Sequence, residues 1–362
     1  MKKLLLLLLA SLLVLSGCTE APTYIDGIAI VYKDNRPYLI DLEGNRFSLA
    51  KYDSIVGEMN EIIIVKKANK FGYILHTGEE IVAPIYDMAM PFSEGLALVK
   101  RNNQFQVINT VGTTVFELPH GIESFSKFQD GLLLSTMEGK YGYLDTNGNV
   151  AIDFEYDDAD LFYEGKAVVG INVDGTIKYG YIEFNNNPIT GFDYIAASRY
   201  QNGYAAVAKT KNSSGYPLYG YIDEFGEEVI AFQYAYAYPF SDGLAVVANY
   251  ITRVAGRNTY TFKDYRYIDV AGNVVINPNV HFVGIFYGNF IPGNFQHGIS
   301  RFFFNSWGIY DKDMNQILRP RYMEMSEFKN GLAVVRAYPA LYGMINESGE
   351  VIIPLEFERI IY

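Results

Sequence analysis

One short phrase recurs along almost the whole chain, and a tandem repeat restricts the possible folds more than any other feature of a sequence. The phrase is an aromatic residue followed by Gly, Tyr, Ile and Asp, then two further residues and a Gly, and, after two more residues, a short β-branched run. Clear copies include Tyr141–Ile152 and Tyr219–Ile230. The residues at its first Gly place stand at positions 37, 72, 106, 142, 180, 220, 266, 308 and 343, which are 34 to 46 residues apart. The sequence therefore contains nine copies.

A second phrase, Phe-Ser-x-Gly-Leu-Ala-x-Val, lies between copies of the first. Phe92–Val99, Phe240–Val247 and Phe328–Val335 are its clearest examples. Within Tyr141–Ile152, the alternation of apolar and aromatic residues is interrupted by Thr146-Asn147-Gly148-Asn149, a combination that favours a tight turn. The first phrase therefore predicts a β-hairpin, and the second predicts a further strand preceded by its own turn. Because no stretch past residue 20 has a helical period, the predicted fold class is all-β.

A single hairpin cannot bury its apolar face alone, so the units must pack on their neighbours. The repeat begins with Gly27–Val31, which matches the second phrase, and ends with the partial unit Phe357–Tyr362. Such ends are expected if the first strand completes the last unit and closes a propeller-like ring. An open β superhelix would give the same sequence, but the matching ends favour the ring. The Gly that follows the aromatic residue is predicted to let a neighbouring ring or strand approach closely.

The N-terminus predicts export and lipidation. Two lysines precede the apolar run Leu4–Leu15, which fits a signal peptide and is too short to span a membrane. Leu15–Cys18 resembles the lipobox of bacterial lipoproteins, and this resemblance implies cleavage before Cys18 and acylation of its thiol. We therefore expect a signal peptide at residues 1–17, an anchor and short linker at 18–26, and the repeat array at 27–362. The Thr that follows Cys18 implies delivery to the outer membrane if the cell has two membranes.

Composition excludes several classes of partner and site. A formal net charge of −12 repels phosphate backbones, so nucleic acid is not an expected partner. The chain has one cysteine, which excludes an internal disulfide or a cysteine-rich metal site, and its four histidines lack metal-ligand spacing. We expect no metal and no cofactor. The 31 tyrosines and 24 phenylalanines favour strands with half-buried surfaces.

The two phrases resemble the bacterial WG-repeat family, also called the KWG-repeat family, which is named for an aromatic-Gly dipeptide. Only Trp307-Gly308 matches that name literally, because Tyr or Phe replaces Trp elsewhere. Gln106 and Arg266 depart from the pattern at the Gly place. The resemblance supplies no catalytic residues, and it implies a binding or interaction role, usually at the cell envelope.

Two acidic segments resemble sites that bind a cation or carry out acid–base catalysis. Asp145-Thr146-Asn147-Gly148-Asn149 resembles the start of a calcium loop, but it lacks the closing acidic ligand and is better interpreted as a hairpin turn. The densest acidic run could hold a cation or form the acid–base pair of a glycosidase, although a solvated strand edge is the favoured interpretation. This run comprises Asp153, Glu155, Asp157, Asp158 and Asp160.

The aromatic residues suggest where a ligand could bind. Rings that recur in phase with the repeat are expected to pack between units, whereas rings outside that phase are better candidates for contact with a ligand. The candidate ligand-binding residues are Tyr200, Tyr204, Tyr236, Tyr238, Tyr250, Phe286, Tyr287 and Phe303.

Three functions follow from these observations. The first is a non-enzymatic, lipid-anchored envelope scaffold that binds a protein partner, and the repeats, the anchor and the lack of a catalytic motif favour it. The second is a lectin-like glycan-binding protein, which the aromatic surplus would serve. A glycosidase acting through the acidic run is the least favoured.

Overall fold

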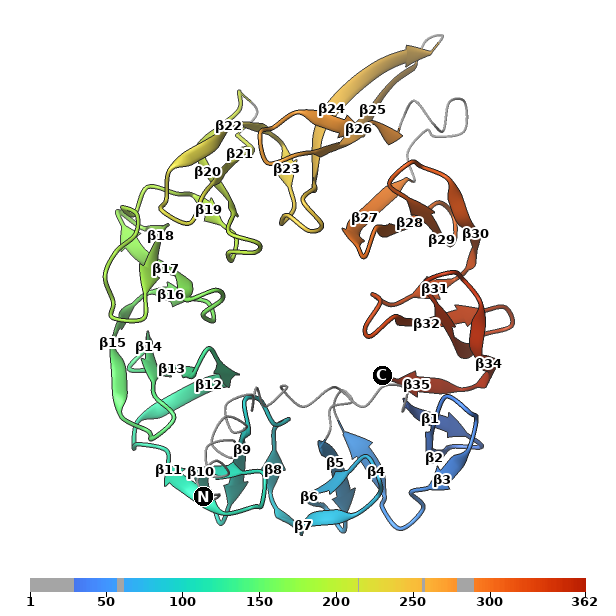
Figure 1. The fold of residues 1–362 in the computed structure, drawn as a ribbon. Helices are drawn as coiled ribbons and strands as arrows, with labels where there is room; N and C mark the ends of the chain where they lie inside the picture. The colour runs from blue at the N-terminus through green and yellow to red at the C-terminus, as the bar shows by residue number, and fades with distance from the viewer. Residues whose placement is uncertain (1–28, 57–61, 214, 256–257, 279–289) are drawn as a thin grey trace, which may run out of the picture.

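The computed structural model describes residues 29–362 except 57–61, 214, 256–257 and 279–289. All the elements within these residues are β-strands, which form nine antiparallel sheets. Figure 1 shows the sheets arranged in chain order around a ring, as the blades of a propeller are. The predicted all-β, propeller-like fold is therefore confirmed.

Blades are numbered here from the N-terminus. Blade 1 contains β35 (Arg359–Ile361), β1 (Ala29–Lys33), β2 (Arg36–Ile40) and β3 (Arg46–Ser48). Blade 2 contains β4 (Ser54–Val56), β5 (Ile62–Lys67), β6 (Lys70–Leu75) and β7 (Glu80–Tyr86). Blade 3 contains β8 (Met88–Ala89), β9 (Leu96–Arg101), β10 (Gln104–Asn109) and β11 (Thr114–Glu117). Blade 4 contains β12 (Ile122–Gln129), β13 (Leu132–Met137), β14 (Lys140–Leu144) and β15 (Val150–Tyr156).

The remaining blades follow the same order. Blade 5 contains β16 (Asp158–Ala159), β17 (Lys166–Val173) and β18 (Thr176–Glu183). Blade 6 contains β19 (Ala196–Ala197), β20 (Ala205–Lys211), β21 (Pro217–Ile222) and β22 (Glu228–Tyr234). Blade 7 contains β23 (Tyr236–Ala237), β24 (Ala245–Ala255), β25 (Asn258–Ile268) and β26 (Val274–Ile276). Blade 8 contains β27 (Ile291–Gln296), β28 (Ile299–Phe303), β29 (Trp307–Asp311) and β30 (Gln316–Tyr322). Blade 9 contains β31 (Glu324–Met325), β32 (Leu332–Ala337), β33 (Leu341–Asn346) and β34 (Val351–Phe357).

The two ends of the chain close the ring. β35, the last strand, pairs antiparallel with β1, and Val31 lies opposite Ile360. The direction of closure was predicted wrongly: the C-terminal strand completes the first blade, and the N-terminal strand does not complete the last one. The repeat unit therefore starts with the inner strand of each blade, which the C-terminus supplies to blade 1.

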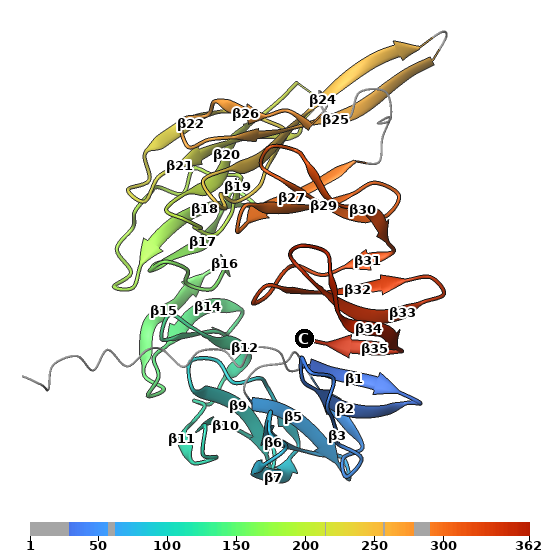
Figure 2. The same ribbon diagram turned by 45° about the vertical axis from the view of Figure 1, so that its right-hand side comes forward.

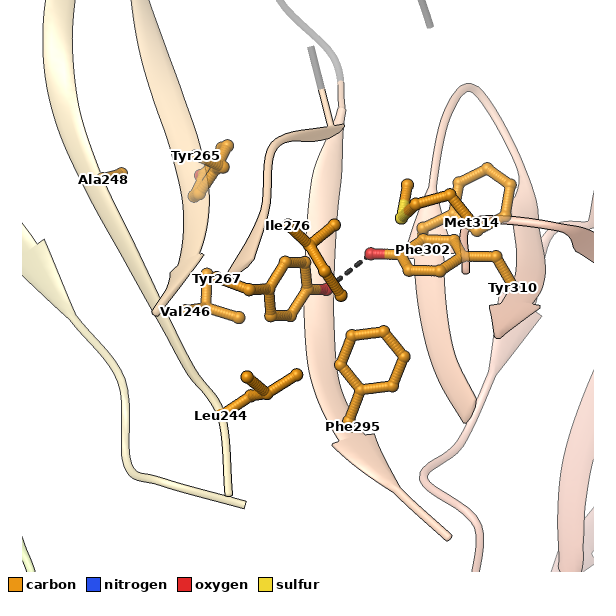
Figure 3. Close-up of a cluster of buried hydrophobic side chains, with 10 residues drawn as sticks. All are labelled: Leu244, Val246, Ala248, Tyr265, Tyr267, Ile276, Phe295, Phe302, Tyr310 and Met314. Carbon is orange, nitrogen blue, oxygen red and sulfur yellow. Dashed lines mark hydrogen bonds between the residues drawn. The ribbon is translucent and has the colours of Figure 1, made fainter. Parts of the chain in front are cut away.

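The hydrophobic core is divided among the blade interfaces. Within the described residues, nine clusters of buried side chains each join two neighbouring blades, including blades 9 and 1. Alternate residues of a second strand face opposite neighbours: Ala97 and Val99 of β9 pack toward blade 2, whereas Leu98 packs toward blade 4. Because both faces of this strand are covered, the second phrase reads as a continuous apolar run. Figure 3 shows one of these cores, in which the Tyr267 and Tyr310 hydroxyls of blades 7 and 8 meet.

The Gly of the first phrase admits the outer strand of its own blade. A Cβ atom on Gly220 would lie 2.3 Å from the Ile230 carbonyl oxygen, and one on Gly72 would lie 2.5 Å from that of Val82. The predicted close approach is thus made by the outer strand, whose register shifts at this point. The outer strands of five of the blades with this Gly (β7, β15, β22, β30 and β34) have 7 residues each. Where Pro37, Gln106 and Arg266 replace it, β3, β11 and β26 have only 3, 4 and 3 residues.

One blade extends beyond the ring. β24 and β25 have 11 residues each and form a long hairpin that projects from blade 7 in Figures 1 and 2. Among the described residues, no helix is long and apolar enough to cross a membrane.

Candidate binding groove

The inner strands of four blades are fixed by buried tyrosines from the preceding blade. The Tyr181 hydroxyl donates to the Ser198 carbonyl oxygen at 2.6 Å, and the Tyr221 hydroxyl donates to that of Tyr238 at 2.8 Å. Burial raises the pKa of Tyr181 well above its usual value, so its hydroxyl keeps the proton that it donates. Tyr73 and Tyr143 make the same bond to the residue 17 positions later in blades 3 and 5. These bonds hold the inner strands of blades 3, 5, 6 and 7 against the previous blade without using their exposed side chains.

Two cavities lie side by side along the inner strands of blades 5, 6 and 7, which follow one another on the inner side of the ring in Figure 1. The first, of 380 Å³, lies between blades 5 and 6, and the second, of 310 Å³, lies between blades 6 and 7. Ala196 and Ala197 of β19 line both cavities, so we treat the two as one groove. The first cavity is lined by Asp158, Ala159, Asp160, Val168, Tyr179, Ile195, Ala196 and Ala197. The second is lined by Ala196, Ala197, Ser198, Ala206, Tyr219, Tyr236, Ala237 and Tyr238.

The groove is acidic at its blade 5 end. Asp158 accepts a hydrogen bond from the Tyr179 hydroxyl at 2.9 Å, and Asp160 is exposed beside it. Burial, and then the bond to Asp158, raises the pKa of Tyr179, so this hydroxyl remains a donor. Among the described residues, no Lys or Arg forms an ion pair with either carboxylate.

The groove is aromatic at its blade 7 end. Tyr236 packs edge-on against Tyr250 at a centroid distance of 5.7 Å, and their hydroxyls are hydrogen-bonded. The Lys263 ammonium lies 3.8 Å from the centroid of the Tyr236 ring. Tyr238 is 38% exposed and lines the cavity together with Tyr219. Since Tyr250 and Lys263 belong to β24 and β25, this end of the groove lies at the base of the long hairpin.

Small side chains create the groove where other blades carry larger ones. Ala196 lies opposite Ala208 in the sheet of blade 6. Met88 and Lys100 occupy the equivalent places in blade 3, as Ser54 and Lys66 do in blade 2. The space beside Ala196 is therefore a departure from the repeat pattern, and it does not occur simply because the blades repeat.

The structure brings together three of the eight aromatic residues predicted to bind a ligand. Tyr236 and Tyr238 line the groove, and Tyr250 contacts Tyr236. Phe303 lies in blade 8 against Trp307, with ring centroids 5.5 Å apart, and it does not line the groove. Phe286 and Tyr287 lie outside the described residues, as does the predicted lipidation site Cys18.

Tyr200 and Tyr204 contribute to packing. Tyr200 is 2% exposed, and its hydroxyl donates to the Asp223 carbonyl oxygen at 2.8 Å. It was classed as outside the repeat phase, but its contact with Tyr181 matches that of Phe240 with Tyr221, so it occupies the Phe place of the second phrase. Tyr204 occupies the following Leu place and packs on Phe240. Neither ring lines the groove.

The acidic run is divided among different roles. Asp157 accepts hydrogen bonds from Lys140 and from the backbone N–H of Asn172, and these bonds lower its pKa. Glu155 accepts a bond from Asn186, and Asp153 is exposed. Only Asp158 and Asp160 line the groove.

The Asp145 segment forms a hairpin turn, in agreement with the favoured interpretation. The Asp145 carboxylate accepts the backbone N–H groups of Asn147 and Asn149 within its own turn. In the described part of the chain, no group of three or more His, Cys, Asp or Glu side chains could hold a metal ion.

Sequence analysis missed Tyr179, Tyr219 and the alanines of the groove. Both tyrosines stand at the first aromatic place of the first phrase, and repeat-phased rings were expected to be core. Aligning the repeats would have revealed the signal, because Gly170 and Ala208 lie beside these rings where Lys66 and Lys100 stand in blades 2 and 3.

Comparison with known proteins identifies the repeat. Five segments of the chain match the WG containing repeat. They are residues 71–105, 141–172, 219–249, 307–337 and 342–362. The resemblance expected from the two phrases is thus confirmed for these segments. The comparison with curated proteins found no match.

Several solved structures are similar in part, all at low sequence identity. The crystal structure of the tricorn protease matches with a TM-score of 0.39 and 12% identity, covering 92% of this chain and 42% of that one. The β-propeller domain of the Trilobed protease from Pyrococcus furiosus matches with a TM-score of 0.39 and 11% identity, covering 84% and 99%. Hsv2p from Kluyveromyces lactis matches with a TM-score of 0.37 and 10% identity, covering 73% and 96%. This chain therefore spans less than half of the tricorn protease chain.

Proposed function

We propose that the chain is a non-enzymatic scaffold of the bacterial envelope that is anchored through Cys18 and binds a partner protein in the groove of blades 5, 6 and 7. The observation that carries the proposal is the groove itself, where small residues interrupt the repeat pattern beside exposed tyrosines. Tyrosine-lined depressions with apolar floors are typical of surfaces that bind other proteins.

The interruption is local, which supports a binding role over a purely structural one. A ring built only for stability gains from filling the space between blades, since buried apolar contact is its main source of stability. Here Ala196, which lines both cavities, leaves such space open, and the exposed Tyr238 borders it. A binding site benefits from this arrangement because the uncovered apolar surface is buried when the partner arrives.

The proposal is tested by filling the groove with a larger side chain. Ala196→Tyr places a ring at the groove floor, and the fold should accept it because Tyr236 occupies the equivalent position in blade 7. Met88→Tyr makes the same change at the equivalent position of blade 3, outside the groove. Solubilised envelopes are passed over each immobilised protein, and captured proteins are identified by mass spectrometry. We expect one partner to be retained by wild type and Met88→Tyr and lost with Ala196→Tyr.

Equal capture by all three proteins would contradict the use of the groove. A glycan screen of the same three proteins tests the lectin-like alternative, because glycan binding that only Ala196→Tyr abolishes would favour a sugar ligand over a protein.

The anchor has its own test. Cys18→Ser should abolish incorporation of labelled palmitate and release the protein from the membrane fraction. Unchanged incorporation would show that acylation occurs elsewhere.

A further inference from the structure

We propose that the blade 5 end of the groove binds the basic side chain of an arginine-bearing segment of the partner protein. This inference rests on the proposed function, and it names the chemistry of the ligand. It is based on a comparison of equivalent positions around the ring.

Four blades place their own cation over the first aromatic ring of the first phrase. In blades 2, 3 and 9 this cation comes from the second-strand residue directly paired with the ring, whereas in blade 8 Arg301 reaches Trp307 from two residues away. In blade 2 the Lys66 ammonium lies 5.4 Å from the centroid of Phe71, and in blade 3 the Lys100 ammonium lies 4.7 Å from that of Phe105. In blade 9 the Arg336 guanidinium carbon lies 5.7 Å from the centroid of Tyr342. Each of these three cations stands directly opposite its ring in the pairing of the second and third strands. The repeat thus carries a site for a cation over an aromatic face.

Blade 9 also supplies a carboxylate to this site. Glu324, on the inner strand, forms an ion pair with Arg336 at 3.0 Å and accepts a hydrogen bond from the Tyr342 hydroxyl at 3.2 Å. The guanidinium therefore has a carboxylate and an aromatic ring as neighbours. These two groups complement its charge and its planar shape.

Blade 5 keeps the carboxylate and the ring but lacks the cation. Asp158 stands at the place of Glu324 and accepts a hydrogen bond from Tyr179, which stands at the place of Tyr342. Gly170 stands at the place of Arg336, and a Cβ atom on this glycine would lie 2.7 Å from the Ile177 side chain, so a basic group can reach Asp158 only from the cavity. Among the described residues, neither Asp158 nor the neighbouring Asp160 is paired with a basic side chain.

The lining of the 380 Å³ cavity suits a long basic side chain. Ala159, Val168 and Ala196 offer apolar surface to its methylene groups, and Asp158 and Asp160 offer acceptors to its charged end. The blade 7 end is less suitable for a cation, because Lys263 already occupies one face of Tyr236. A basic residue of the partner is therefore expected at the blade 5 end, where it would give Asp158 and Asp160 the charge partner that Arg336 gives Glu324 in blade 9.

The experiment measures binding of two fluorescent octapeptides by anisotropy. Both alternate alanine with a second residue, which is arginine in one peptide and citrulline, its neutral analogue of nearly the same shape, in the other. We expect wild type to bind the arginine peptide at least tenfold more tightly than the citrulline peptide. Asp158→Asn/Asp160→Asn should reduce that ratio to below twofold.

A charge-matched variant controls for general attraction between an acidic protein and a basic peptide. Asp153→Asn/Glu224→Gln removes the same charge from two exposed residues outside the groove, and it should keep the wild-type ratio. Equal losses in the two double variants would overturn the proposal, because only net charge would then matter. If the groove double variant does not fold, the ratio of the two peptide affinities is measured for Asp160→Asn alone, which changes one exposed carboxylate.

The outcomes separate this inference from the proposed function. Equal binding of both peptides by wild type, abolished by Ala196→Tyr, would overturn the basic ligand while supporting the groove. Binding of the arginine peptide that Ala196→Tyr and Asp158→Asn/Asp160→Asn both leave unchanged would overturn both proposals.

Discussion

Blades 3 and 6 share their strand order, yet only blade 6 borders the groove. In blade 3, Met88 lies opposite Lys100, whose ammonium covers the ring of Phe105. In blade 6, Ala196 lies opposite Ala208, and Tyr219 lines a cavity. The difference lies in side chains at the inner strand and beside the first aromatic ring, whereas the pairing of the inner strand with the second strand is the same in both blades. A groove can therefore arise between blades without a change in that pairing.

The two blades also differ in what holds them. Blade 6 has Gly220 and Tyr221, which admit a 7-residue outer strand and donate a hydrogen bond to blade 7. Blade 3 has Gln106 and Val107 at these positions, and its outer strand has 4 residues. Blade 6 therefore combines an open surface with a more strongly restrained framework.

The largest expected loss of stability follows substitution of Gly220, the glycine of the first phrase in blade 6. Gly220→Ala places a Cβ atom 2.3 Å from the Ile230 carbonyl oxygen, which forces the outer strand to move. We expect it to lower the free energy of unfolding by about 2 to 3 kcal/mol in urea titrations. Gln106→Gly in blade 3 should cost only about 1 kcal/mol, because it raises the backbone entropy lost on folding and removes an exposed hydrogen bond from Thr114, but forces no strand to move. Equal losses at the two positions would show that the close approach in blade 6 is unimportant for stability.

An intermediate loss of stability is expected for substitution of Tyr221, which follows Gly220. Tyr221→Phe removes the donor of the 2.8 Å hydrogen bond to the Tyr238 carbonyl oxygen. Leaving that acceptor without its partner should lower the free energy of unfolding by about 1 to 2 kcal/mol. Tyr216→Phe is the matched control, since Tyr216 is 60% exposed, and it should have no measurable effect. A loss in the control as large as that in Tyr221→Phe would contradict this role of the interblade bond.

The smallest expected effect is a pH-dependent contribution to stability that blade 3 has and blade 6 lacks. Asp87 directly precedes the inner strand of blade 3, and the Lys70 ammonium of blade 2 and the backbone N–H of Asn102 lower its pKa, whereas blade 6 has Ile195 at that place. A carboxyl whose folded pKa is lowered stabilises the fold above its unfolded pKa, and this stabilisation is lost as the pH falls through the folded value. Asp87→Asn should therefore lower the urea midpoint at pH 7 and leave it nearly unchanged at about pH 2. An equal shift at both pH values would indicate that the Asp87 charge contributes nothing.

Much of this fold can be predicted from the sequence because its units are local. Each hairpin is specified by a turn such as Asp145–Asn149 and by alternation over a few residues, and the repeat shows that the units are equivalent. The candidate site was predicted only in part. Tyr236, Tyr238 and Tyr250 were identified as rings outside the repeat phase, whereas Tyr179 and Tyr219 were dismissed because they follow it.

The sequence by itself determined the all-β class, the hairpin unit and the number of copies, since turn chemistry and strand alternation act over short distances. Only the tertiary structure decided that the C-terminal strand closes blade 1, because either end could in principle supply the missing strand. It also decided that four tyrosines that follow a glycine of the first phrase tie one blade to the next, and that Ala196 lies between two cavities. These features depend on which side chains from different blades meet, and that is settled by the packing of the ring.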